Sequence, residues 1–189
     1  MENKKNLFLI LGNGFTIDLL SKLEKNMIDT VNLFSKGDTV VWPDGSNERG
    51  FLSYKHCPSL WNLGARPYMN KNDAIELIED IITCANMVTS SNVVTPGSNI
   101  YIGAYYELVA YLKHLFIQYN KQVDDSELTS GRIQSWGWYD LIKKAYDSDK
   151  YKKIIIITYN YDVFLERILK LNHLNFTIQG LENTDNKII

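Results

Sequence analysis

Four consecutive isoleucines, Ile154 to Ile157, constrain the fold of this chain more than any other feature. β-Branched side chains favour extended backbone, and a run that is apolar at every position is typical of a strand buried on both faces. Leu7 to Leu11 is a second continuous apolar run, and a Gly-Asn-Gly turn closes it. Because strands of this kind occur mainly in parallel sheets covered by helices, we predict an α/β fold.

Amphipathic segments between and after these runs predict the helices. Apolar residues recur at helical spacing at Tyr105, Leu108, Leu112, Leu115 and Tyr119, which is typical of a buried helix face. We expect helices over residues 16–26, 72–88, 100–123, 138–146 and 163–171, and a further strand over 175–179. This alternation predicts a Rossmann-like parallel sheet with helices on both faces.

Residues 35–70 have a different composition, rich in Gly, Pro, Asp, Asn and isolated aromatic residues, without sustained periodicity. We interpret them as an inserted helical and loop region within a single domain of residues 1–189. A hairpin is one option there and disorder is the alternative. A turn-rich loop is expected between the helices at 72–88 and 100–123.

Composition excludes several classes of protein. The formal net charge is −2 without a run of one sign, so a nucleic-acid or anionic-membrane surface is not indicated. Two cysteines exclude both a disulfide-dense secreted scaffold and a four-thiolate zinc site. No apolar stretch approaches the length of a membrane span, so we expect a cytoplasmic protein.

Two polar segments follow the two predicted strands, at the sheet edge where α/β proteins bind ligands. The first is Gly12-Asn13-Gly14-Phe15-Thr16, whose glycines allow backbone to approach a pyrophosphate next to a helix N-terminus. A plain strand-to-helix turn is the alternative, because Ile17 stands where a dinucleotide fingerprint has its third glycine.

The second segment is Thr158-Tyr159-Asn160-Tyr161-Asp162. The Asn160 amide can hold a ribose hydroxyl or a water, and Asp162 can accept a hydrogen bond from a carboxamide. Helix capping is the alternative, because Asn and Asp are favoured at helix N-termini. If the two segments meet, one ligand can contact both.

The order LFLILGNGFTIDL, helices, then KKIIIITYNYDVFLERIL resembles the sirtuin-like superfamily, and most of all its bacterial antiphage branch. That family has a Gly-Ala-Gly-Phe-Ser type turn after its first strand and Thr-Xaa-Asn-Tyr-Asp after a later one. The Gly-Asn-Gly-Phe start also resembles, more weakly, the AbiH abortive-infection family.

The resemblance implies roles for these residues. Gly12, Asn13, Gly14, Phe15 and Thr16 would hold the NAD diphosphate, and Asn160 would be the catalytic amide beside the nicotinamide ribose and the attacking water. Asp162 would lie at the nicotinamide carboxamide, with Thr158, Tyr159 and Tyr161 in the same NAD site. No metal is expected.

Two features of the family are absent from this sequence, and both bear on the activity that the resemblance implies. The four-cysteine zinc module of deacetylating sirtuins is absent, which argues against a protein deacetylase. The family's catalytic His-Gly pair is also absent from these 189 residues, so the chain is either part of a longer protein or a truncated form. His173 is expected near a helix end, His114 in a structural role and His56 in the insertion.

The function expected from this resemblance is an NAD+ glycohydrolase of an antiphage abortive-infection system, which cleaves NAD+ to nicotinamide and ADP-ribose. The alternative is a catalytically silent nucleotide-binding or assembly module of a defence complex. A third option is an interaction domain that reuses the fold, with Trp42, Trp61, Trp136 and Trp138 in packing or contact roles. Expected partners are further copies of the chain, other defence subunits or a phage protein trigger.

Overall fold

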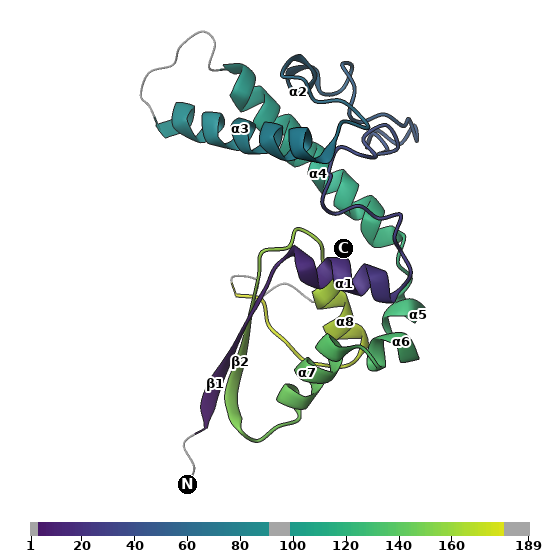
Figure 1. Ribbon diagram of the computed structural model, residues 1–189, viewed down its shortest axis with the longest axis vertical. Helices are drawn as coiled ribbons and strands as arrows, with labels where there is room; N and C mark the ends of the chain where they lie inside the picture. The colour runs from purple at the N-terminus through teal and green to yellow at the C-terminus, as the bar shows by residue number, and fades with distance from the viewer. Residues whose placement is uncertain (1–3, 91–98, 180–189) are drawn as a thin grey trace. The chain divides into compact units, whose positions relative to one another are not determined.

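The computed structural model describes residues 4–90 and 99–179, and within them the chain is a mixed α/β protein (Figure 1). In chain order the elements are β1 (Lys5–Leu11), α1 (Asn13–Lys22), α2 (Pro58–Asn62), α3 (Lys71–Ser90), α4 (Asn99–Lys121), α5 (Asp125–Leu128), α6 (Gly131–Gln134), α7 (Gly137–Tyr146), β2 (Tyr151–Thr158) and α8 (Phe164–Leu171). None of the helices in these two ranges is long and apolar enough to cross a membrane.

The chain forms two compact units, and β1 and β2 both belong to the first. This unit contains Met1–Ile28 and Asn120–Ile189, whereas the second contains Asp29–Tyr119. The insertion expected over residues 35–70 therefore lies inside the second unit. Both polar segments that follow the strands lie in the first.

The parallel pairing of β1 with β2 confirms the two strands predicted from the apolar runs (Figure 1). Leu7 pairs with Ile154 and Leu11 with Thr158, so the carboxyl ends of the strands are level. One face is uncovered in the part of the chain described, since Phe8 is 59% and Ile10 70% exposed. Over the same residues the sheet has these two strands, and the larger sheet remains a prediction.

The strand predicted over residues 175–179 is wrong. Residues 174–178 have no regular structure and pair with neither β1 nor β2. Leu174 is buried but Ile178 is 39% exposed, so only the start of the segment is packed. A short stretch containing β-branched residues forms a strand only when its backbone groups pair with the edge of another strand, and residues 174–178 do not pair with the outer edge of β1 or of β2.

The five predicted helices are present, with ends that differ by a few residues. The buried stripe of α4 is Ala104, Leu108, Tyr111, Leu115 and Tyr119. The predicted stripe was wrong at Tyr105, which is exposed, and at Leu112, which is half-buried. Ala104 and Tyr111 lie on the core face instead. Alanine is small enough to pack there, and the Tyr111 hydroxyl donates a hydrogen bond to the Leu33 carbonyl at 2.7 Å.

The insertion is packed rather than extended. It contains α2 and a single antiparallel bridge between Val41 and Arg49, which is the hairpin-like feature considered above. Val40, Phe51 and Leu60 are buried, so isolated aromatic and apolar residues build a local core without helical or strand periodicity. The loop expected after α3 falls on residues 91–98, outside the described residues.

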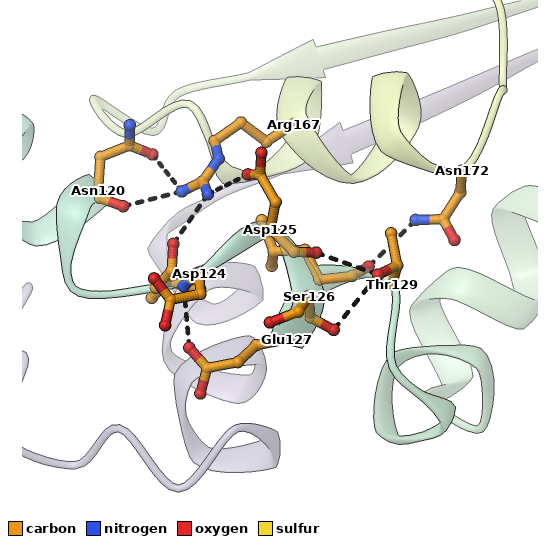
Figure 2. Close-up of polar contacts among 10 residues, drawn as sticks. Asn120, Asp124, Asp125, Ser126, Glu127, Thr129, Arg167 and Asn172 are labelled. Atoms are coloured by element: carbon orange, nitrogen blue, oxygen red, sulfur yellow. Dashed lines mark hydrogen bonds and ion pairs between the residues drawn. The ribbon is translucent and has the colours of Figure 1, made fainter.

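Arg167 fixes α8, the helix that follows the second polar segment (Figure 2). Its Nη1 donates to the backbone and side-chain oxygens of Asn120, both at 2.8 Å, and its Nη2 donates to the Val123 carbonyl and to Asp125. The guanidinium therefore binds the end of α4 and the start of α5. A planar donor group with several fixed N–H directions is suited to this arrangement.

We predict that Arg167→Met will lower the free energy of unfolding by about 2–4 kcal/mol, because buried carbonyls lose charge-assisted hydrogen bonds while the aliphatic stem is kept. Urea unfolding followed by circular dichroism measures the change. Asp125→Asn is the matched control. The Asp125 side chain is 65% exposed, so its loss is expected to cost less than about 1 kcal/mol. Equal losses would show that the ion pair, and not the backbone contacts, fixes α8.

Candidate functional site

The two polar segments begin at the same edge of the sheet. Leu11 and Thr158 are register partners at the ends of β1 and β2, and the Tyr159 N–H donates to the Leu11 carbonyl at 3.0 Å. The ladder thus continues one residue past β2. From this point β1 leads into the glycine turn and β2 into the segment that contains Asn160.

The glycine turn is exposed, and neither its backbone conformation nor its packing requires glycine at positions 12 and 14. Gly12 is the N-cap of α1 with φ −123°, and Gly14 lies in the first turn of the helix without a positive φ. A Cβ added at either glycine would meet nothing within 4 Å. Gly12, Asn13 and Gly14 all face solvent. The first turn of α1 has no side-chain cap and no acidic residue, so the positive end of its dipole is not neutralised there.

Phe15 has a structural role in this turn. Its side chain is 3% exposed and packs on Trp136 and Trp138, with ring centroids 5.0 and 5.9 Å away. Its N–H donates to the Gly12 carbonyl at 2.9 Å. Trp136 also donates from Nε1 to Asp18 at 2.7 Å, so it binds two residues of α1. Phe15 therefore positions the turn by packing, and neither its ring nor its amide is left for a phosphate.

Thr16 joins the two segments. Its side chain is fully buried, and its hydroxyl donates to Asp162 Oδ2 at 2.7 Å. Asn160 Nδ2 donates to the same hydroxyl oxygen at 2.8 Å. The hydroxyl expected at the phosphate turn is thus engaged with the second segment. The structure therefore brings Thr16, Asn160 and Asp162 together, 146 residues apart in sequence at the extremes.

The second segment also forms local hydrogen bonds of the capping type. Asp162 Oδ1 accepts from the Phe164 N–H at 3.1 Å, at the start of α8, so the capping role considered as an alternative is present as well. Thr158 Oγ1 accepts from the Asn160 N–H at 3.1 Å. Tyr159 is 74% and Tyr161 73% exposed, so their rings lie outside this hydrogen-bonded cluster.

Two acceptor atoms near these residues are buried without a hydrogen-bond partner in the part of the chain described: Asn160 Oδ1 and Glu166 Oε2. Burial raises the pKa of the Asp162 carboxyl, an effect that hydrogen bonds from Thr16 and Phe164 partly oppose. Burial also raises the pKa of Glu166, and the nearby Asp162 charge adds to the rise. The sequence pattern did not single out Glu166. Its acid–base environment depends on packing that spacing does not reveal.

One histidine belongs to the first unit and two belong to the second. His173 is exposed just after α8 with φ 58°, as expected for a helix-end residue. His114 packs on Phe51 at 5.5 Å between ring centroids, and His56 stacks on Trp42 at 4.0 Å. Both belong to the second unit.

A hollow in the first unit does not coincide with the motifs. It has a volume of about 470 Å³ and lies around the Arg167 contacts, lined by Asn120, Lys121, Val123, Asp124, Asp125, Arg167, Lys170 and Leu171. None of the motif residues lines it. We base the candidate site on the motif residues, because the hollow is bounded by a guanidinium whose hydrogen bonds are already made. Within residues 4–90 and 99–179, no group of three or more His, Cys, Asp or Glu side chains is placed to hold a metal.

We predict that the carboxyls of Asp162 and Glu166 titrate above their ordinary range in 13C-detected NMR, because burial disfavours the charged forms. The sign for stability follows. A carboxyl with a raised folded-state pKa contributes stability that is fully present below its unfolded pKa and is lost as pH rises through the folded pKa.

Two exposed carboxyls in the same spectra are internal controls. A hydrogen bond from Ser46 lowers the pKa of Asp44, and one from Lys55 lowers the pKa of Glu48. Asp162 should therefore titrate above Asp44, and Glu166 above Glu48. The reverse order in both pairs would show that the cluster is more solvated than its buried atoms indicate.

Comparison with known proteins gives no assignment. No protein-family model, no curated protein and no solved structure matches the chain significantly. The family resemblance thus depends on the two motifs and their order. The function has to be argued from the chemistry of the cluster.

Proposed function

We propose that this chain is the NAD-binding part of an NAD+ glycohydrolase, which acts in an abortive-infection defence system. One observation carries the proposal: Thr16 of the glycine-turn segment bonds both Asn160 and Asp162, while Asn160 Oδ1 is buried without a partner among the described residues. An unpaired buried acceptor costs about 1–3 kcal/mol, which a ligand hydroxyl or a water can recover.

The glycine turn supports a diphosphate beside this amide. At Gly12 and Gly14 the backbone conformation is open to any residue and a Cβ would meet no atom of the chain, so packing does not explain the glycines. Close approach of a ligand does explain them. The uncapped first turn of α1 then supplies backbone N–H groups and a partial positive charge to a phosphate.

The reaction would be hydrolysis of the bond between nicotinamide and ribose. The electron pair of that bond leaves with nicotinamide, whose ring nitrogen thereby loses its positive charge, and water forms the new bond to the ribose carbon. The second proton of the water passes to solvent or to a base. Asn160 Oδ1 would accept a hydrogen bond from the water or from a ribose hydroxyl, and this orients the nucleophile.

This function requires a larger fold than the two strands described. We propose that β1 and β2 are the centre of a Rossmann-like parallel sheet with helices on both faces. The exposed Phe8 and Ile10 support this, because parallel sheets are normally covered on both faces. Further strands and helices would come from other parts of the protein or from a partner, which fits an oligomer or a complex with other defence subunits and a phage-derived trigger.

A catalytically silent nucleotide-binding module is the second candidate. The histidine content of the first unit favours it, because the one histidine described there, His173, is exposed after α8 and lies outside the hydrogen-bonded cluster of Thr16, Asn160 and Asp162. Calorimetric titration with NAD+ and ADP-ribose, next to an assay for released nicotinamide, distinguishes the candidates. Binding without release supports the silent module.

We predict that Asn160→Ala in the full-length protein lowers nicotinamide release at least about 100-fold, because the nucleophile is no longer oriented. Chromatographic detection of nicotinamide measures it, and circular dichroism checks the fold. Asn62→Ala is the matched control, since Asn62 is exposed at the end of α2 in the second unit. Full turnover by Asn160→Ala would remove Asn160 from the reaction.

A second variant separates binding from stability. Gly14→Ala should raise the free energy of unfolding by about 0.5 kcal/mol, because alanine loses less backbone entropy in a helix. The same methyl group should weaken NAD+ binding by at least about tenfold, because it occupies the diphosphate's position. Thermal unfolding and calorimetry measure the two effects. Unchanged affinity would show that the turn does not contact the ligand.

A further inference from the structure

The hydroxyl of Thr16 has one hydrogen and can donate it to one acceptor only. An ionised Asp162 has no hydrogen to give, so the hydroxyl must donate to Asp162 Oδ2, 2.7 Å away. The hydroxyl oxygen is then an acceptor for Asn160. The Asn160 side chain, 2.8 Å away, must therefore present its NH2 group to Thr16 and leave its carbonyl oxygen on the other side.

The far end of this chain of hydrogen bonds is fixed as well. Asp162 Oδ1 accepts the Phe164 N–H at 3.1 Å, at the first residue of α8. A backbone N–H cannot reverse its role, so position 162 needs an acceptor on that side. Each Asp162 oxygen thus accepts one hydrogen bond from the protein, Oδ2 from the Thr16 hydroxyl and Oδ1 from the Phe164 N–H.

We infer that Thr16 and Asp162 are positioning residues that hold the Asn160 amide in the one orientation with its carbonyl oxygen available to a substrate hydroxyl or water. The effect of this orientation on turnover rests on the proposed function, whereas the orientation itself does not. It also assigns Asp162 a role different from the one the family resemblance implies. Asp162 acts through the Thr16 hydroxyl on Asn160, and direct contact with the nicotinamide carboxamide is not required.

Asp162→Asn tests the direction of the hydrogen bonds that link residues 162, 16 and 160, because this substitution is designed to reverse that direction. The carbonyl oxygen of the new amide stays on the Phe164 N–H, so its NH2 group faces Thr16 and donates to the hydroxyl oxygen. Thr16 must then donate to Asn160, and the Asn160 amide turns to present its oxygen. The number of hydrogen bonds is kept while the group available to a substrate changes from an acceptor to a donor.

Thr16→Val and Thr16→Ser form the matched pair. Valine has nearly the same shape as threonine but lacks the hydroxyl, so it removes the hydrogen bonds to both Asn160 and Asp162. Serine keeps the hydroxyl and loses only a methyl group. If the hydroxyl orients Asn160, the serine variant behaves like wild type and the valine variant does not.

The direct readout is NMR of the Asn160 side-chain NH2 group, assigned by its disappearance in Asn160→Ala. In wild type and Thr16→Ser this group should show nuclear Overhauser contacts to residue 16 and slow hydrogen exchange. In Asp162→Asn and Thr16→Val the contacts should be lost and exchange should become faster. Unchanged spectra in folded Asp162→Asn and Thr16→Val would overturn the inference without any measurement of activity.

Turnover is the second readout. Asp162→Asn and Thr16→Val should lower kcat for nicotinamide release at least about 100-fold with a smaller change in KM, because the nucleophile is misoriented. Thr16→Ser should stay within about threefold of wild type, since its hydroxyl is kept. If the spectra change as expected but wild type releases no nicotinamide, the proposed function fails and the positioning stands. If wild type turns over, Asn160→Ala does not and Asp162→Asn is fully active, the positioning fails.

Discussion

The level pairing of β1 with β2 is the constraint on which the candidate site depends. Parallel strands end at the same edge, so the glycine turn and the Asn160 segment start from neighbouring residues although more than 140 positions separate them. Thr16 then converts this proximity into a specific contact. Without the register of Leu11 with Thr158, the hydroxyl, the amide and the carboxylate would not meet.

Packing elsewhere in the first unit maintains this arrangement. Phe15 and Asp18 both contact Trp136, which holds α1 after the glycine turn. Arg167 binds the Asn120 and Val123 carbonyls and holds α8 after the Asn160 segment. Trp136 therefore anchors α1, which carries Thr16, and Arg167 anchors α8, which directly follows the segment with Asn160 and Asp162. A site on anchored elements keeps its geometry better than one on free loops.

The sequence predicted the parts of this fold that local patterns determine. Continuous β-branched and apolar runs fit a parallel sheet, and this predicted the strands at Leu7 to Leu11 and Ile154 to Ile157. The segments that follow the strands were candidates for a site because α/β proteins bind ligands at the carboxyl ends of parallel strands. Residues 175–179 form no strand, because strand formation requires a partner edge that the segment itself does not encode. The short helix α5 was missed, although the Glu127 side chain caps it at the Asp124 N–H, 2.9 Å away.

The sequence predicted that the two polar segments meet, but not which contacts their side chains make. The family resemblance assigned Phe15 and Thr16 to a phosphate turn, whereas the structure buries both side chains, one against tryptophans and one against Asn160 and Asp162. Glu166 and Arg167 had no distinguishing signal, because their environments arise from tertiary contacts. Asp162 accepts the Phe164 N–H at the start of α8, a hydrogen bond of the capping type, whereas its contact with a ligand carboxamide stays a prediction.

The central claim is that one nucleotide contacts the glycine turn and Asn160 at the same time. Titration of the 15N-labelled protein with ADP-ribose, followed by 1H–15N correlation spectra, tests it most directly. The account predicts that the Gly14 backbone amide and the Asn160 side-chain amide shift together and report the same dissociation constant. Shifts confined to residues around Arg167, or at only one of the two amides, would contradict it.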